Sequence, residues 1–336
     1  MTVYDGKRVF VTGAEGFIGS HLADALVRKG ASVTALALYN SFGTSGWLDR
    51  LDSEVRKAMH IVHGDVRDPH MMRRLIHNQD IVFHLAALIA IPYSYAAPQS
   101  YVDTNVSGTL NILEAVKGGG AGRLVHTSTS EVYGTAQFTP ISESHPLQGQ
   151  SPYSASKIAA DHLVESYVRS FETPAVILRP FNTFGPRQSE RAVIPTVVRQ
   201  ALDPACAEIR LGDPSPVRDF NYVEDIAAAF LAAGSAPDLP LGRPFNAGSG
   251  RAVTIGEMTE RVREITGCNK PIVEESARRR PARSEVFELL ADPNAFGSAT
   301  GWRSEIGFEV GLERTVEWWR NEIAAGRLRL DSGYQV

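Results

Sequence analysis

Short apolar runs alternate with amphipathic segments along the first half of the chain. Residues Val9 to Val11 are consecutively apolar, and from Phe17 to Val27 apolar residues recur at helical spacing. Further apolar runs predict strands at residues 32–38, 61–63, 80–85, 123–127 and 175–178. Strands that alternate with helices predict an α/β fold with a doubly wound parallel sheet, in which ligands bind at the carboxyl ends of the strands.

Three glycines interrupt this pattern between the first strand and the first helix. Gly13, Gly16 and Gly19 are spaced G-x-x-G-x-x-G, one residue longer at the front than the commoner G-x-G-x-x-G fingerprint. Glycines here let the backbone approach a pyrophosphate, and the N–H groups that begin the next helix attract its charge. The turn therefore predicts a dinucleotide site in a Rossmann-like sheet.

The end of the second expected strand leaves the choice between NAD and NADP open. NAD-binding sheets usually carry an acidic residue there, which accepts the ribose hydroxyls. The equivalent place near Ala37 has no acid and no adjacent arginine for a 2′-phosphate. The polar segment 39–49 is expected to be a loop over the adenosine half of the cofactor.

Two further residues at the ends of expected strands carry open alternatives. Asp65 follows the third strand, where an adenine contact and a loop-capping role are equally compatible with the sequence. His84 lies inside the fourth strand, and an apolar run favours a packed structural histidine over a catalytic one.

Composition narrows the possible partners. A formal net charge of −4 provides no general attraction for nucleic acid or anionic lipid. Cys206 and Cys268 lie far apart without ligand spacing, so neither a disulfide framework nor a metal site is expected. The sequence has no apolar run long enough to span a bilayer and no signal region, which predicts a cytoplasmic protein without membrane contact.

Candidate chemistry follows the fifth expected strand. Thr129, Ser130 and Glu131 come directly after it, and about twenty residues later Ser151 and Pro152 begin an expected helix that carries Tyr153 and Lys157 four residues apart on one face. A phenol is a poor base at neutral pH, but an adjacent ammonium and a cationic nicotinamide both stabilise its phenolate. This spacing makes Tyr153 a candidate general base.

In this order the glycine turn, the Thr-Ser-Glu segment and the Y-x-x-x-K pair resemble the extended short-chain dehydrogenase/reductase family, specifically its sugar-nucleotide epimerases, dehydratases and decarboxylases. The second half resembles it too, through R-x-x-N-x-x-G-P at residues 179–186 and R-D-F-x-Y-V-x-D at residues 218–225. The resemblance covers nearly the whole chain. It implies a tightly bound and recycled NAD, with NADP not excluded, a sugar-nucleotide substrate, and a homodimer formed through the helices that start at Pro98 and Pro152.

The resemblance and the motifs together define domains and candidate residues. Residues 1–180 are expected to form the cofactor-binding Rossmann domain with the catalytic pair, and residues 181–336 mainly a substrate lobe, with some chain returning to the first domain. The expected catalytic residues are Thr129, Ser130, Glu131, Tyr153 and Lys157. The expected cofactor-binding residues are Gly13, Gly16, Phe17, Ile18, Gly19, Tyr39, Asn40, Asp65, Val66, Leu85, Ala86, Ala87, Asn105, Tyr153, Lys157 and Pro180. The expected substrate-binding residues are Glu131, Asn182, Arg187, Val193, Arg218 and Arg280.

Relatives of this kind diverge after a shared first step, oxidation of the sugar at C4. Glu131 disfavours a simple epimerase, which needs no carboxylate there, whereas S-T-S-E-x-Y-G resembles both UDP-glucuronate decarboxylases and GDP-mannose-type 4,6-dehydratases. The glucose 4,6-dehydratases carry Asp where this chain has Ser130, so Glu131 has to serve as base and then as acid.

Three stretches favour one reaction. Residues 39–49, 85–95 and 280–286 resemble the N-acetylhexosamine-nucleotide 4,6-dehydratases of legionaminic-type sugar pathways. The prediction is a redox-neutral 4,6-dehydratase that forms a 4-keto-6-deoxy sugar nucleotide. The alternatives are a UDP-glucuronate decarboxylase, with Arg187 or an arginine of residues 278–280 facing the sugar carboxylate, a 4-epimerase, and a silent NAD-sensing scaffold.

Overall fold

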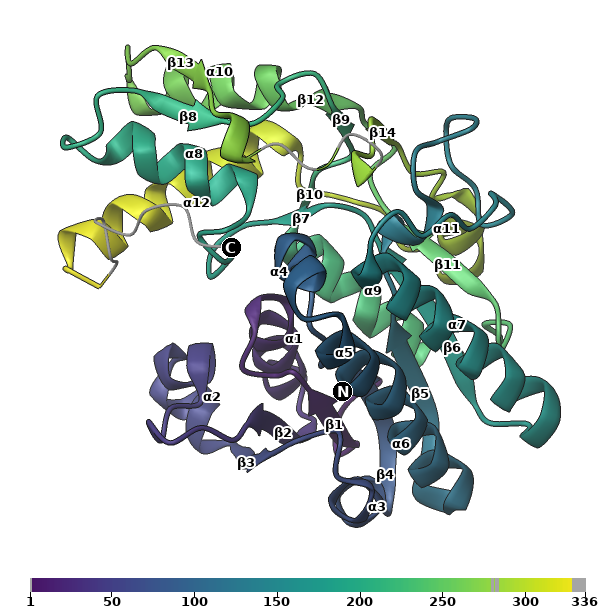
Figure 1. Cartoon of the computed structure of the whole chain (residues 1–336). Helices are drawn as coiled ribbons and strands as arrows, with labels where there is room; N and C mark the ends of the chain where they lie inside the picture. Colours follow the sequence, from purple (N-terminus) through teal and green to yellow (C-terminus); the bar gives the residue numbers. More distant parts are fainter. Residues whose placement is uncertain (1, 279–280, 282–283, 328–336) are drawn as a thin grey trace.

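A seven-stranded parallel sheet forms the centre of the larger lobe (Figure 1). The computed structural model describes residues 2–278, 281 and 284–327. The strands run in the order β11-β6-β5-β4-β1-β2-β3. Their bounds are β1 Arg8–Thr12, β2 Ser32–Leu38, β3 Met59–Gly64, β4 Gln79–His84, β5 Ala121–Thr127, β6 Ala175–Pro180 and β11 Pro244–Ala247. The order reverses direction between β1 and β4, and such a switch point opens a crevice at the carboxyl ends of the strands.

Helices cover both faces of this sheet, because each strand alternates its side chains between two apolar layers. Val9 and Val11 pack with one set of helices and Phe10 with the other. The first set is α1 Phe17–Arg28, α2 Ser53–Lys57, α9 Val223–Ser235 and α11 Asn294–Thr300. The second set is α3 Pro69–Ile76, α6 Gly108–Ala115 and α7 Pro152–Phe171. The expected Rossmann-like α/β fold is thereby confirmed.

The smaller lobe has a core of its own. Its helices are α8 Val193–Leu202, α10 Ile255–Thr266 and α12 Phe308–Ala324. Its short strands are β7 Thr183–Phe184, β8 Ile209–Leu211, β9 Val217–Arg218, β10 Asn221–Tyr222, β12 Val253–Thr254, β13 Ile272–Glu274 and β14 Glu288–Leu289. Between these elements the chain returns to the larger lobe, where α9 packs on α1 and β11 pairs with β6. The two lobes are therefore interwoven in sequence.

The two lobes also touch through α12. The short helix η1, Gly46–Arg50, follows β2, and its Trp47 ring lies 5.7 Å from the Trp318 ring on α12. Arg50 donates to the Glu322 carboxylate at 2.8 Å. Trp319 is fully buried in the small-lobe core, whereas Trp318 is only partly buried and forms this contact between lobes. The loop after β2 is thus held against the smaller lobe.

The helical segment that begins at Pro98 departs from a regular α-helix. After α4 Ile91–Ala96, it runs through α5 Pro98–Tyr101, the π-helix η2 Val102–Ser107, α6 and the π-helical end η3 Val116–Gly120. Wide π turns occur often at functional sites. Here the wide turn carries Asn105 into the interior, where it is 1% exposed. The remaining short helices are η4 Ser130–Tyr133 and η5 Ser276–Arg278.

Within the described ranges, none of the helices combines the length and apolar character needed to cross a membrane.

We expect Gly19→Ala to destabilise the protein. A Cβ at Gly19 would lie 2.1 Å from the Gly13 carbonyl oxygen, a backbone atom that can move only with the whole turn. Overpacking of this kind costs about 1–3 kcal/mol. Urea unfolding should show this loss, and nucleotide binding should weaken with it.

Gly118→Ala is the matched control for that substitution. Gly118 has a negative φ of −68°, and a Cβ there meets nothing within 4 Å. Its replacement should leave the stability unchanged or raise it slightly, because alanine restricts the unfolded chain. Equal stabilities of the Gly19 and Gly118 variants would contradict the close approach described above.

Candidate active site

The glycine turn is shaped for a ligand that approaches the backbone. Gly13 has a φ of +66°, and a Cβ there would lie 2.8 Å from the Ala86 nitrogen, so the turn and the segment after β4 are in direct backbone contact. Gly16 precedes α1 as its N-cap and supplies no side chain to the first helical N–H groups. These open donors and the absence of side chains fit the pyrophosphate of a dinucleotide. The crevice thus suits the cofactor that the glycine spacing predicts.

A buried chain of hydrogen bonds starts directly in front of this turn. The Thr12 hydroxyl accepts from the backbone N–H groups of Leu85 and Ala86, both at 3.1 Å, and lies 2.8 Å from His84 Nδ1. Because that hydroxyl already accepts twice, it donates to Nδ1, and the ring proton therefore resides on Nε2. Nε2 then donates to the Thr109 hydroxyl at 3.1 Å, which donates to the Asn105 carbonyl. His84 is a neutral structural histidine, as the apolar run predicts.

Asn105 continues the chain to the catalytic helix. Its side chain accepts from Leu88 N–H and donates to the Leu88 carbonyl and the Ser156 hydroxyl. Ser156 in turn donates to the Tyr153 carbonyl at 2.7 Å. Both polar atoms of the Asn105 side chain thus bind protein groups, which position α7 against the loop after β4. A direct contact of Asn105 with the cofactor stays a prediction.

The sequence positions the Tyr153 and Lys157 pair through the start of α7. Ser151 caps the helix in a reciprocal box with Ser154, and Pro152 occupies its first turn. Tyr153 and Lys157 follow on the face that packs against the sheet, and they are 7% and 3% exposed. Lys157 Nζ donates to the Thr127 carbonyl at the end of β5.

Thr129, Ser130 and Glu131 lie beside this pair as the sequence predicts. Thr129 caps η4 by accepting from the Glu131 N–H, Ser130 is buried, and Glu131 is partly exposed. Burial raises the pKa of the Tyr153 phenol, and a hydrogen bond with Thr129 acts in the opposite direction, while the Glu131 carboxylate raises it further. Burial also lowers the pKa of Lys157 to about 8. The structure therefore brings the five expected catalytic residues to one place.

A buried polar network lies behind Lys157, and sequence analysis missed it. Asp161, one helical turn after Lys157, accepts from the Arg179 guanidinium and from Ser128. Arg179 also donates to the Tyr133 hydroxyl, whose own proton goes to Asn246. The spacing Lys157 to Asp161 was a visible signal, because residues four apart share a helix face.

His126 lies against this network. Its Nε2 is 3.5 Å from an Asp161 oxygen, and its ring is 5.6 Å from that of His84. Burial lowers the pKa of His126 to about 4, with the cations Lys157 and Arg179 acting in the same direction. The Lys157 and Arg179 charges thus face Asp161, while His126 stays neutral.

The candidate cofactor residues outside the glycine turn and α7 include three groups. The first group lies at the start of α1, after β4 and at the last residue of β6, and comprises Phe17, Ile18, Leu85, Ala86, Ala87 and Pro180. In the loop after β2, Tyr39 is largely exposed and Asn40 uses its side chain to hold the loop through Leu38 and Thr44.

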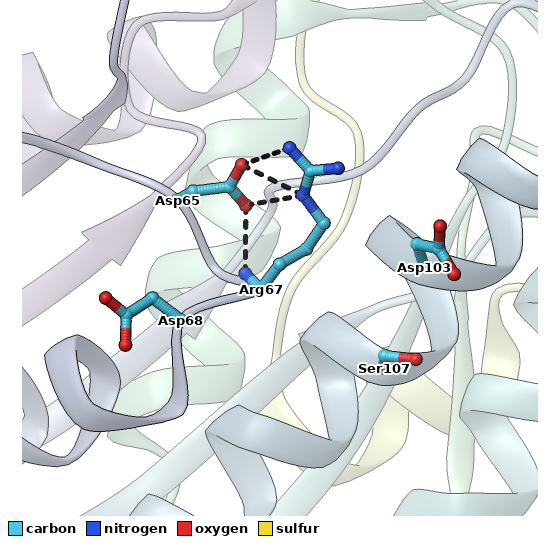
Figure 2. Close-up of a pocket in the computed structure, with 5 residues that line it drawn as sticks. All are labelled: Asp65, Arg67, Asp68, Asp103 and Ser107. Atoms are coloured by element: carbon cyan, nitrogen blue, oxygen red, sulfur yellow. Dashed lines mark hydrogen bonds and ion pairs between the residues drawn. The ribbon is translucent and has the colours of Figure 1, made fainter.

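Asp65 borders a pocket at the end of β3 (Figure 2). Arg67, Asp68, Asp103 and Ser107 line the rest of it. The Asp65 carboxylate accepts from the backbone N–H and the guanidinium of Arg67, so its side chain caps this turn. Val66 packs against Gly108, where a Cβ would lie 2.8 Å from the valine methyl group. Of the two alternatives left open for Asp65, the geometry favours loop capping.

The candidate substrate residues are spread over the smaller lobe and the segment that leads to it. Asn182 follows β6, and its buried side-chain oxygen has no hydrogen-bond partner within the described residues. Val193 begins α8. Arg218 is 5% exposed and faces Glu285 at 3.5 Å.

Arg187 contacts the helix α1, and its contact with a substrate stays a prediction. It has a φ of +70°, and its guanidinium donates to Ser20 on α1 at 3.3 Å. The neighbouring Pro186 carbonyl accepts from His21, also on α1. This turn therefore docks on the helix that follows the glycines. Arg280 lies outside the described residues.

Comparison with known proteins agrees with this geometry. A family model described as GDP-mannose 4,6 dehydratase matches residues 10–315. The chain belongs to this family. Within the described residues, no group of three or more histidine, cysteine, aspartate or glutamate side chains could hold a metal ion.

Several relatives and solved structures match this chain over nearly its full length and theirs. The low-salt glycan biosynthesis protein Agl12 of Haloferax volcanii is 32% identical over 93% of this chain and 98% of its own. UDP-glucose 4-epimerase of Thermotoga maritima, solved with UDP-glucose, has a TM-score of 0.84 and 29% identity over 94% of this chain and 99% of its own. DesIV, the dTDP-glucose 4,6-dehydratase of Streptomyces venezuelae, solved with NAD, has a TM-score of 0.84 and 30% identity over 95% and 98%. The chain is thus an enzyme of the sugar-nucleotide dehydratase and epimerase superfamily, which confirms the resemblance seen in its motifs.

We expect acid to destabilise the protein through its buried histidines. Burial lowers the pKa of His126 and of His21 from 6.5 to about 4. Between these values the unfolded chain binds protons that the folded chain does not. Stability is therefore complete above pH 6.5 and falls as the pH drops toward 4, by about 1.4 kcal/mol per histidine per pH unit. Urea unfolding at a series of pH values measures this slope.

His126→Gln should reduce the dependence of stability on pH by the contribution of one histidine, about 1.4 kcal/mol per pH unit. The variant is also expected to lower stability at pH 7, since the ring fills space beside His84. A slope equal to that of the unmodified protein would show that His126 binds protons equally in the folded and unfolded chain, so that burial does not lower its pKa.

Proposed function

We propose that this enzyme is an NAD-dependent 4,6-dehydratase of a nucleotide-linked sugar, with an N-acetylhexosamine as the sugar. The observation that carries the proposal is Glu131, a carboxylate that follows Thr129 and acts electrostatically on the Tyr153 phenol. NAD is supported by the open glycine turn and by NAD in the structure of the similar dehydratase DesIV. The N-acetylhexosamine is supported by the resemblance of residues 39–49 and 85–95.

In the proposed first step, Tyr153 removes the proton of the sugar 4-hydroxyl. Burial favours the neutral phenol, and the hydrogen bond with Thr129 acts in the opposite direction. In this proposal the positive charge of Lys157, one helical turn away, also stabilises the phenolate. The nicotinamide, when bound, supplies a hydride acceptor for C4 and later a hydride donor for C6. Asp161 holds Lys157 charged in an interior that otherwise favours the neutral amine.

The proposed second step is the loss of water, and it falls to Glu131. A ketone at C4 makes the C5 proton acidic, and a carboxylate beside it can remove that proton and then protonate the departing 6-hydroxyl. Ser130 occupies the place at which glucose 4,6-dehydratases carry a second acid, and its hydroxyl is buried. One carboxylate therefore serves both transfers in this proposal.

The decarboxylase alternative has less support. It needs an arginine opposite the sugar carboxylate, yet Arg187 contacts α1 and Arg278 pairs with Glu275. The epimerase alternative draws support from the similar UDP-glucose 4-epimerase but gives Glu131 no role in the chemistry. A silent scaffold has no use for the complete set of Thr129, Tyr153 and Lys157.

Assembly and location are part of the same proposal. A homodimer through the helices that begin at Pro98 and Pro152 is supported by exposed apolar side chains there, Val102, Leu110 and Phe171. A cytoplasmic location is supported by the sugar-nucleotide chemistry of the family.

Mass spectrometry of the protein with a panel of sugar nucleotides and NAD tests the reaction. Loss of one water from an N-acetylhexosamine nucleotide, without net NADH, is the expected result. Loss of carbon dioxide from a glucuronate would identify a decarboxylase, and a product of unchanged mass with inverted C4 would identify an epimerase.

Two substitutions separate the steps. Tyr153→Phe should lower kcat by about 100-fold to 10,000-fold, because the C4 proton loses its acceptor. Glu131→Gln should still exchange hydride at C4 but release little dehydrated product, so a 4-keto sugar that retains its 6-hydroxyl should accumulate. Equal water loss by the Glu131 variant and the unmodified enzyme would remove Glu131 from the proposed chemistry.

A further inference from the structure

One carboxylate at the cofactor end of the crevice has no role in the chemistry described above. Glu15 lies between Gly13 and Gly16 in the glycine turn, and its side chain reaches across to the end of β2. There Glu15 Oε1 accepts from the backbone N–H of Leu38 at 3.0 Å. Leu38 is the last residue of β2, so the carboxylate lies where the sequence of the strand itself offers no acid.

The second oxygen of this carboxylate is left without a partner. Glu15 Oε2 is buried and accepts no hydrogen bond from any group of the described chain. Burial raises the pKa of the Glu15 carboxyl, while the Leu38 N–H acts in the opposite direction. A buried acceptor without a donor is costly, and it becomes favourable when a ligand supplies one.

The backbone holds Glu15 in this position. Trp47 N–H donates to the Glu15 carbonyl at 3.0 Å, and Gly46 packs so closely that a Cβ there would lie 2.7 Å from the same oxygen. Trp47 is in turn held by Trp318 on α12. The glycine turn, the loop after β2 and the substrate lobe together fix this carboxylate.

The charges around the carboxylate suit hydroxyl groups and not a phosphate. Residues 39–49 contain no lysine or arginine. Two arginines just outside that loop are already paired, Arg50 with Glu322 and Arg67 with Asp65. His63, which acts electrostatically on Glu15, shares a hydrogen bond with the Ser45 hydroxyl. A 2′-phosphate placed here would meet the Glu15 carboxylate with no free cation of that loop to compensate, whereas ribose hydroxyls are donors that the carboxylate can accept.

We propose that Glu15 is the cofactor-specificity residue of this enzyme, which binds the adenosine ribose hydroxyls of NAD and rejects the 2′-phosphate of NADP. The inference rests on the dinucleotide part of the proposed function and is independent of the reaction at the sugar. It places the ribose-binding acid on the glycine turn instead of on the second strand.

Binding measurements on the full chain, freed of nucleotide, test this proposal without reference to activity. Calorimetry should give an affinity for NAD at least about tenfold higher than for NADP, and also about tenfold higher than for an NAD analogue that lacks the 2′-hydroxyl of the adenosine ribose. This arm uses the unmodified protein, so it does not depend on how a variant folds.

Glu15→Gln supplies the second arm, because it keeps the size of the side chain and an acceptor for the Leu38 N–H. The variant should bind NAD about tenfold more weakly and NADP more tightly, while its affinity for the 2′-deoxy analogue, which keeps only the 3′-hydroxyl, should fall by less than that for NAD. A merely structural role for Glu15 would weaken NAD and the analogue equally. Glu54→Gln, an exposed charge change on α2 that pairs only with its own helix, is the matched control and should alter none of the affinities.

The outcomes separate this inference from the proposed function. Equal affinities of the unmodified protein for NAD and NADP, or an equal loss of NAD and analogue binding in Glu15→Gln, would overturn the role of Glu15 and leave the dehydratase proposal standing. Binding of neither dinucleotide would overturn both.

Discussion

The structure depends on a buried chain of hydrogen bonds that joins the glycine turn to the catalytic helix. Thr12, His84, Thr109 and Asn105 connect β1, β4 and α6, and Ser156 completes the connection to Tyr153. Each polar group in it is buried and therefore has to be satisfied, so the elements can assemble in only one arrangement. The chain thereby fixes the position of Tyr153, the candidate general base, relative to the glycine turn.

Two contacts between the lobes lie beside the elements that flank the glycine turn and β2. Trp318 and Glu322 on α12 hold η1 through Trp47 and Arg50, while Pro186 and Arg187 dock on α1. The first contact is with η1, which follows β2, and the second is with α1, which begins within the glycine turn. The smaller lobe therefore contacts both the loop after β2 and the helix that follows the glycine turn.

Periodicity and motif spacing were enough to predict the central sheet and the shared helix face of Tyr153 and Lys157, because both depend on local signals. A run of apolar residues predicts each strand, and Tyr153 and Lys157 are four residues apart on a capped helix. The network of Asp161, Arg179 and His126 joins α7, β6 and β5, and no local pattern encodes which buried polar residues face one another across a sheet. The wide turn at Asn105 was also missed, since its sequence is compatible with a regular helix.

Glu15 shows why a strand-by-strand interpretation of cofactor preference is incomplete. The physical requirement is a fixed carboxylate near the ribose, and the end of β2 is only the commonest element to supply it. In this chain β2 ends in Ala37 and Leu38, and the Leu38 backbone N–H instead anchors a carboxylate that arrives from the glycine turn. The two segments are neighbours in the sheet, so either can serve the same site. The acid that the second strand lacks in sequence is therefore present in space, and the requirement belongs to the site rather than to any one element.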